Sequence, residues 1–187
     1  AELGGEATAA AMALGSETLL IGDGTGLLTG WTPAGIAAGT GPTFSRSFGD
    51  SSIVSVRPGD RDRTIAVGTA DGTAVLYNTL SDKVIARISP GEEAAVSGEP
   101  TLKLAAASPA SDVALLTGAG GSASVFEIEP GHTGSSFKAL FGKVKYEGYD
   151  TPEYVYQSTG LGGTEPKFSL VPLIFGTIKA TVVAMLF

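Results

Sequence analysis

The chain has 187 residues and a mass of 18.8 kDa, the size of one domain or of one domain with an appendage. Its 27 glycines and 10 prolines make up about a fifth of the chain, less than in disordered low-complexity segments, so a packed core should form. The lack of cysteine excludes disulfides, thiolate zinc sites and cysteine nucleophiles, and the net charge of -7 argues against nucleic-acid binding.

Three similar segments, at residues 19–31, 64–77 and 113–126, dominate the first two thirds of the chain. Each consists of an apolar run, a glycine-rich turn and a second run that ends in an aromatic residue. Such runs separated by Asp-Gly or Gly-Gly are typical of antiparallel hairpins, because glycine accepts the positive φ of tight turns. The glycine-rich stretches 22–26 and 118–121 are therefore interpreted as hairpin turns rather than phosphate-binding loops, which would need a helix after them.

The middle copy predicts four strands, at residues 53–56, 64–68, 73–77 and 83–88, and resembles a WD-repeat blade. Tyr77-Asn78 stands where such blades usually carry Trp-Asp. Tandem four-stranded units of about 45 residues are typical of β-propellers. We therefore predict a mainly β fold, a partial β-propeller of about three WD-like four-stranded blades within residues 1–145. The blades are expected near 9–48, 53–90 and 102–141.

Propellers close with four to eight blades, so three are too few. Because the chain starts with Ala1 rather than methionine, the expectation is that further blades precede it.

An acidic, tyrosine-rich linker is predicted over residues 146–169. It holds four of the five tyrosines, which either lie at a membrane interface or pack on the rim of the propeller. These are Tyr146, Tyr149, Tyr154 and Tyr156. The linker carries four carboxylates and one basic residue, Lys167, and such a flank is typical of the non-cytoplasmic side of a membrane.

Residues 170–187 contain one charge, Lys179, and are predicted to begin a transmembrane helix that continues beyond Phe187. Lys179 would face a pore or extend to the interface. The expected membrane anchor is formed by Leu170, Val171, Leu173, Ile174, Phe175, Ile178, Val182, Val183, Leu186 and Phe187.

The sequences KYEGYDTPEYVYQSTG and EPKFSLVPLIFGTIKATVVAMLF, at residues 145–160 and 165–187, resemble the entry to the second transmembrane helix of phosphate ABC transporter permeases, in their long proteobacterial form. One departure is that 162–164 runs directly into 165–167 without an acidic stretch between them. The resemblance implies a WD-repeat-like insertion, residues 1–169, on the periplasmic side of the bacterial inner membrane.

The resemblance also implies the cargo and the partners. The cargo would be inorganic phosphate. The partners would be a second permease subunit, cytoplasmic ATPase subunits and a periplasmic phosphate-binding protein.

Three arginines, Arg57, Arg61 and Arg63, alternate with Asp60 and Asp62 and are the candidate ligands for phosphate. The alternative is a solvated loop in which the carboxylates neutralise the arginines. The single histidine, His132, is interpreted as a turn residue, so we expect no enzyme, no cofactor and no metal site.

An alternative function is a stand-alone β-propeller that binds proteins or acts as a sensor, with the apolar C-terminal stretch folded back into the core.

Overall fold

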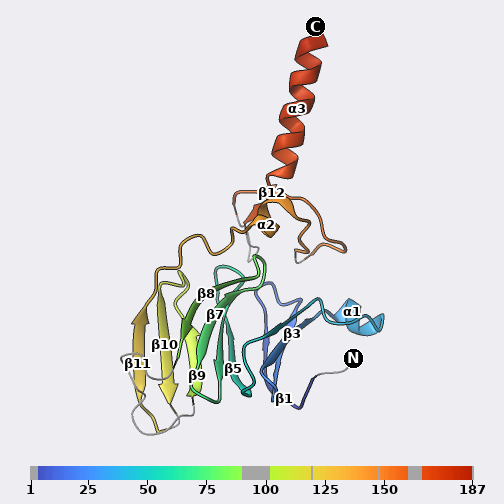
Figure 1. The fold of residues 1–187 in the computed structure, drawn as a ribbon. Coiled ribbons are helices and arrows are strands. Elements are labelled where there is room, and N and C mark those ends of the chain that lie inside the picture. Colours follow the sequence, from blue (N-terminus) through green and yellow to red (C-terminus); the bar gives the residue numbers. More distant parts are fainter. Residues whose placement is uncertain (1–3, 90–101, 119, 147, 160–165, 187) are drawn as a thin grey trace.

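The computed structural model describes residues 4–89, 102–118, 120–146, 148–159 and 166–186. Figure 1 shows three antiparallel sheets standing side by side, a small set of loops and short elements above them, and a helix that projects away. The mainly β, partial-propeller prediction is confirmed.

The sheets follow one another in chain order, and each is a simple meander. The first consists of β1 (Ala7–Met12), β2 (Leu19–Asp23), β3 (Leu27–Trp31) and β4 (Phe44–Ser47), with the short helix α1 (Pro33–Ala37) between β3 and β4. The second consists of β5 (Ile53–Pro58), β6 (Thr64–Thr69), β7 (Ala74–Asn78) and β8 (Lys83–Ile88). The third has three described strands, β9 (Leu102–Ala107), β10 (Val113–Gly118) and β11 (Ala123–Glu127).

The hairpin turns of the three repeats have the conformation that their glycines predict. Gly26, Gly72 and Gly121 have φ values of 83°, 93° and 84°. In the first two turns an aspartate also closes the loop. Asp23 Oδ1 accepts hydrogen bonds from Thr25 N at 2.9 Å and Leu27 N at 3.1 Å.

Burial by itself raises the pKa of Asp23, but the hydrogen bonds from Thr25 and Leu27 outweigh it and hold that pKa below its ordinary value. Asp71 closes the second turn in the same way and also has a lowered pKa. The repeated carboxylates thus have a structural role in the turns.

Two apolar cores lie between the sheets. The first and second sheets share a core that includes Leu20, Leu28, Ile53, Val67 and Tyr77. The second and third sheets share another core, formed by Ala66, Ala74, Leu76, Leu102, Ala105, Ala114 and Leu116. The sheets therefore stack face to face, as the blades of a propeller do.

The stacking is closest where a glycine of one sheet meets an aliphatic side chain of the next. A Cβ placed on Gly22 of β2 would lie 2.5 Å from Ile53 Cγ2 and 2.8 Å from Ile53 Cβ. A Cβ placed on Gly68 of β6 would collide with Leu102 Cδ2. Both glycines therefore leave the space that the first strand of the following sheet occupies.

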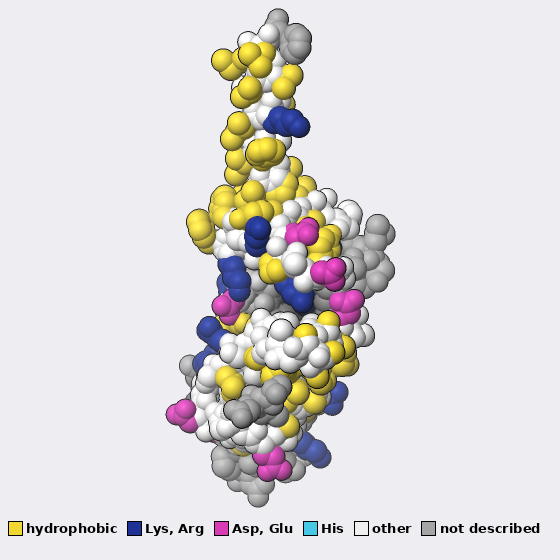
Figure 2. All heavy atoms as spheres, turned by 90° about the vertical axis from the view of Figure 1, so that its right-hand side faces the viewer, with side chains coloured by type: hydrophobic (Ala, Val, Ile, Leu, Met, Phe, Trp, Pro, Cys, Tyr) yellow, Lys and Arg dark blue, Asp and Glu magenta, His cyan; other side chains and the backbone are white. Residues whose placement is uncertain are grey.

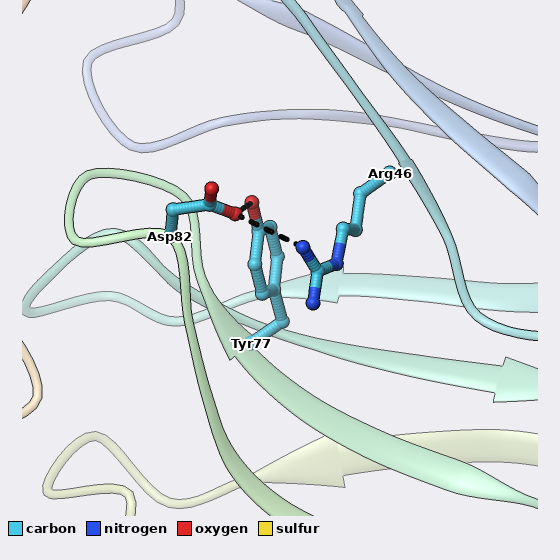
Figure 3. A network of polar contacts seen from close by, with 3 residues as sticks. All are labelled: Arg46, Tyr77 and Asp82. Carbon is cyan, nitrogen blue, oxygen red and sulfur yellow. Dashed lines mark hydrogen bonds and ion pairs between the residues drawn. The ribbon is translucent and has the colours of Figure 1, made fainter.

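A polar contact joins β4 of the first sheet to Tyr77 of β7 and to the turn that follows β7 (Figure 3). The Tyr77 hydroxyl donates to Asp82 Oδ1 at 2.6 Å, and Arg46 Nη1 of β4 lies 3.7 Å from the same oxygen. Burial, together with the hydrogen bond to Asp82 and its negative charge, raises the pKa of Tyr77 well above its ordinary value. Tyr77 therefore stays protonated and keeps the hydroxyl donor that holds this contact.

The Gly22→Ala variant should unfold more easily than the wild type, by about 1–3 kcal/mol, because the added methyl meets the Cβ of Ile53 next to the backbone. Gly68→Ala should cost less, because the far end of the Leu102 side chain can rotate away. Urea unfolding measures both, with Gly41→Ala as the control, since nothing lies near its Cβ position. Equal costs for all three would contradict this account of the stacking.

Candidate functional site

Between the sheets and the C-terminal helix lies a compact region that we call the platform, residues 131–146, 148–157 and 166–170 (Figure 1). It contains α2 (Phe137–Phe141), β12 (Tyr156–Gln157) and β13 (Lys167–Phe168), and β12 pairs with β13. Ser136 caps α2 by accepting a hydrogen bond from Ala139 N at 3.1 Å. The segment between β11 and residue 141 thus forms a loop and a helix where a fourth strand of the last sheet would be expected.

The platform docks on the second sheet through Thr133. Its hydroxyl donates to Asp62 Oδ2 at 2.7 Å, and its carbonyl accepts a hydrogen bond from Ser81 Oγ at 2.7 Å. Ser81 is positioned by Asn78, whose buried side-chain oxygen accepts from Ser81 N at 2.9 Å. Asp62, expected to neutralise arginines, therefore fastens the platform to the propeller.

An apolar contact and a second hydrogen bond complete the docking. Leu80 of the second sheet packs against Val144 and Tyr146 of the platform, and all three are buried. Gly148 N donates to Glu17 Oε2 of the first sheet at 2.7 Å. The platform therefore contacts both the first sheet and the second sheet.

Lys167 is the single basic residue of the predicted linker. It is buried between aromatic rings. Its side chain is 4 % exposed, and Nζ lies 5.4 Å from the Tyr146 ring centroid and 5.7 Å from that of Tyr149. Nζ also lies 3.2 Å from Gln157 Oε1. This cation–π cage attaches the segment before the C-terminal helix to the platform.

The C-terminal helix, α3 (Val171–Leu186), begins directly on the platform. Leu170 N donates to Leu140 O at 2.8 Å, and Ser169 N donates to Val155 O at 3.0 Å. None of its residues is buried, and it projects away from the rest of the molecule (Figure 1). The alternative in which this stretch folds back into the core therefore does not describe the structure.

The expected anchor residues 171–186 lie on α3, Leu170 lies at its base, and Phe187 lies outside the described residues. Within the part of the chain that the structure describes, no helix combines the length and the apolarity required to cross a membrane.

The four tyrosines form one packed pair and one exposed pair, and a position at a membrane interface stays a prediction. Tyr146 and Tyr149 pack inside the platform, with their rings 6.0 Å apart in an edge-on contact. Tyr154 and Tyr156 are exposed. Of the predicted acidic residues of this region, Glu147 and Glu165 lie outside the described residues.

The three candidate arginines do not form one site. Arg57 is exposed on β5 and lines a cavity with Lys103. Arg61 and Arg63 line a different cavity of about 260 Å³ under the platform, together with Asp62 and Thr133. The role of these arginines as phosphate ligands stays a prediction, and only Arg61 and Arg63 are close enough to share a ligand.

A basic cavity of about 230 Å³ was not expected from the sequence. It lies between the first two sheets and the platform, and Arg63 and three platform lysines, Lys138, Lys143 and Lys145, line it with Glu17. The clustering of lysines at 138–145 was the available signal, but their distance in sequence from Arg63 concealed the site.

His132 is exposed in the loop before α2, and its carbonyl accepts hydrogen bonds from Ser135. No group of three or more His, Asp or Glu side chains within the described residues could hold a metal ion.

Comparison with known proteins identifies the fold. No family model and no curated protein matches the chain. Among solved structures, the β-propeller domain of Cps50 (Swd1) from Myceliophteria thermophila aligns with a TM-score of 0.54 at 13% identity, over 69% of this chain and 38% of that one. A chain of the mitotic checkpoint complex aligns with a TM-score of 0.52 at 15% identity, over 67% of this chain and 37% of that one.

The C-terminal WD40 domain of Sif2 aligns with a TM-score of 0.47 at 16% identity, over 65% of this chain and 31% of that one. The alignment with the Cps50 (Swd1) domain, together with the stacked four-stranded meanders, shows that this chain has a β-propeller fold. The chain spans less than two fifths of the length of these similar structures.

The Thr133→Val variant should loosen the platform, because Asp62 loses a hydrogen bond that valine cannot replace. We expect the free energy of unfolding to fall by about 1–2 kcal/mol and amide exchange to accelerate in 131–146. Thr117→Val in β10, a strand outside the platform, is the matched control. Unchanged exchange in 131–146 would show that the Asp62–Thr133 contact does not hold the platform.

Proposed function

We propose that this chain is a WD40-type propeller module for protein interaction, carried at a membrane by α3. The observation that supports the proposal is the helix itself, which is rich in apolar residues, has no buried residue and extends away from the propeller. The apolar side chains of α3 are exposed to water, so their transfer to an apolar environment such as a lipid layer would be favourable.

The dimensions and composition of α3 fit insertion into a bilayer from one side. Its 16 residues span about 24 Å, most of the hydrocarbon core of roughly 30 Å. Its eight Val, Leu, Ile and Phe residues would together favour insertion by about 2–5 kcal/mol, which is comparable with the cost of roughly 3 kcal/mol for Lys179. A lysine on a helix can also reduce that cost by extending its amine toward the headgroups.

Protein interaction is the role that the propeller fold and its surface favour. The third sheet ends in the edge strand β11 and exposes Val125 and Leu115. An edge strand offers unpaired backbone groups, and exposed aliphatic side chains beside it offer apolar area to a partner.

A finer proposal is that the membrane protein is the permease subunit of an ATP-driven inorganic phosphate importer. It is supported by the resemblance of residues 145–160 and 165–187 to the entry of a permease helix. On this proposal residues 1–169 lie in the periplasm of a bacterium and have no catalytic role. The partners would be a second permease subunit, cytoplasmic ATPase subunits and a periplasmic phosphate-binding protein.

Membrane attachment can be tested with the full chain and lipid vesicles. Wild-type protein should float with the vesicles, and Ile178→Asp should reduce the bound fraction by at least about tenfold, because a carboxylate in the helix opposes insertion. Ile36→Asp places the same charge on exposed α1 and serves as the control, which should float like the wild type. Flotation of Ile178→Asp at the wild-type level would contradict the role of α3.

The permease proposal predicts that the coding sequence continues after Phe187 with several further hydrophobic spans. Sequencing the flanking codons checks this, and a stop codon directly after Phe187 would overturn it.

If the spans are present, phosphate uptake by cells with the Arg61→Glu variant tests the arginine prediction. Unchanged uptake would remove Arg61 from the candidate ligands.

A further inference from the structure

Four exposed aromatic side chains lie on the platform from which α3 emerges. Phe137, Phe141, Tyr154 and Tyr156 are 81 %, 39 %, 41 % and 45 % exposed. We call these four residues the aromatic collar. Large aromatic side chains normally contribute to a core or an interface, so four exposed on one small region favour contact with another surface.

Backbone contacts fix three of the collar residues close to the start of α3, and Tyr154 precedes Val155, whose carbonyl accepts the hydrogen bond from Ser169 N. Phe137 and Phe141 lie at the two ends of α2, their rings are 4.9 Å apart, and the carbonyl of Leu140 between them accepts the hydrogen bond from Leu170 N. Tyr156 pairs with Phe168 in the two-stranded sheet that precedes α3. Figure 2 shows apolar side chains continuing from the helix onto the platform at its base.

Two lysines that also line the basic cavity, Lys138 and Lys143, lie beside the aromatic side chains. Lys138 is exposed within α2, and the Nζ of Lys143, also exposed, lies 5.6 Å from the ring centroid of Tyr154. Aromatic rings with a hydroxyl or a neighbouring ammonium group suit the headgroup region of a bilayer, which is apolar on one side and anionic and wet on the other. Such a mixture suits a dry protein interface less, because the lysines would lose their hydration there.

We propose that the aromatic collar is a second membrane contact, which rests in the headgroup layer while α3 enters the hydrocarbon core. The inference rests on the proposed insertion of α3, because that insertion brings the base of the helix to the headgroup level. Two contacts hold the domain more firmly than one helix. The collar sets the tilt of the platform, and the platform sets the height of the sheets above the lipid.

The lack of cysteine allows a direct test with single spin labels. A nitroxide is attached to cysteine in Phe141→Cys, Tyr154→Cys, Ile178→Cys and Ile36→Cys, each in the full chain. Vesicles of phosphatidylcholine and phosphatidylglycerol are added, and accessibility to oxygen and to a water-soluble nickel complex reports the depth of each label. We expect Ile178 in the hydrocarbon core, Phe141 and Tyr154 at headgroup depth, and Ile36, on α1, in water.

The outcomes separate this inference from the proposed function. Lipid exposure at Ile178 with aqueous labels at both Phe141 and Tyr154 would overturn the collar and leave membrane attachment intact. An aqueous label at Ile178 would overturn both. Spin–spin broadening at Phe141 without headgroup depth would mean that a second copy covers the collar, and would also overturn the inference.

A binding measurement provides an independent check. The Phe137→Ser, Phe141→Ser double variant should weaken vesicle binding by at least about tenfold, because two phenylalanine rings no longer leave water. Both residues are exposed, so the fold should survive, and circular dichroism verifies this. Ile36→Ser is the matched control, and equal affinity for the double variant and the control would overturn the collar.

Discussion

The close approach of neighbouring sheets at Gly22 and Gly68 is the constraint on which the rest of this structure depends. At each point a glycine of the second strand leaves room for an aliphatic side chain from the first strand of the next sheet, Ile53 or Leu102. Two buried cores form around these contacts. This stacking brings Glu17 and Asp62 to the side where the platform docks.

The repeated hairpins could be predicted from sequence because their determinants are local. Glycine at a positive φ and an aspartate that accepts hydrogen bonds from the turn lie within a few residues of the strands that they connect. All four strands of the middle blade lie within two residues of their predicted positions. The last sheet differs, because the polar residues after β11 lack the alternating apolar pattern of a strand and form the loop and α2 instead.

The platform could not be predicted, because long-range contacts determine it. Asp62 was interpreted as a neighbour that neutralises arginines, but its Oδ2 accepts a hydrogen bond from Thr133, 71 residues away. Lys167 was counted as a surface charge, but it is buried against Tyr146 and Tyr149. The three arginines do not share one site, because Arg57 lies within β5 whereas Arg61 and Arg63 lie in the turn that follows it.

The junction between β13 and α3 has a mechanical consequence. Ser169 and Leu170, the two residues between the strand and the helix, both donate backbone hydrogen bonds to the platform. The junction is therefore stiff, and a change in the angle of the helix acts as a torque on the domain. Because the helix is about 24 Å long, a force on its free end would act on the platform with the leverage of that length and would reach the first two sheets through Glu17 and Asp62.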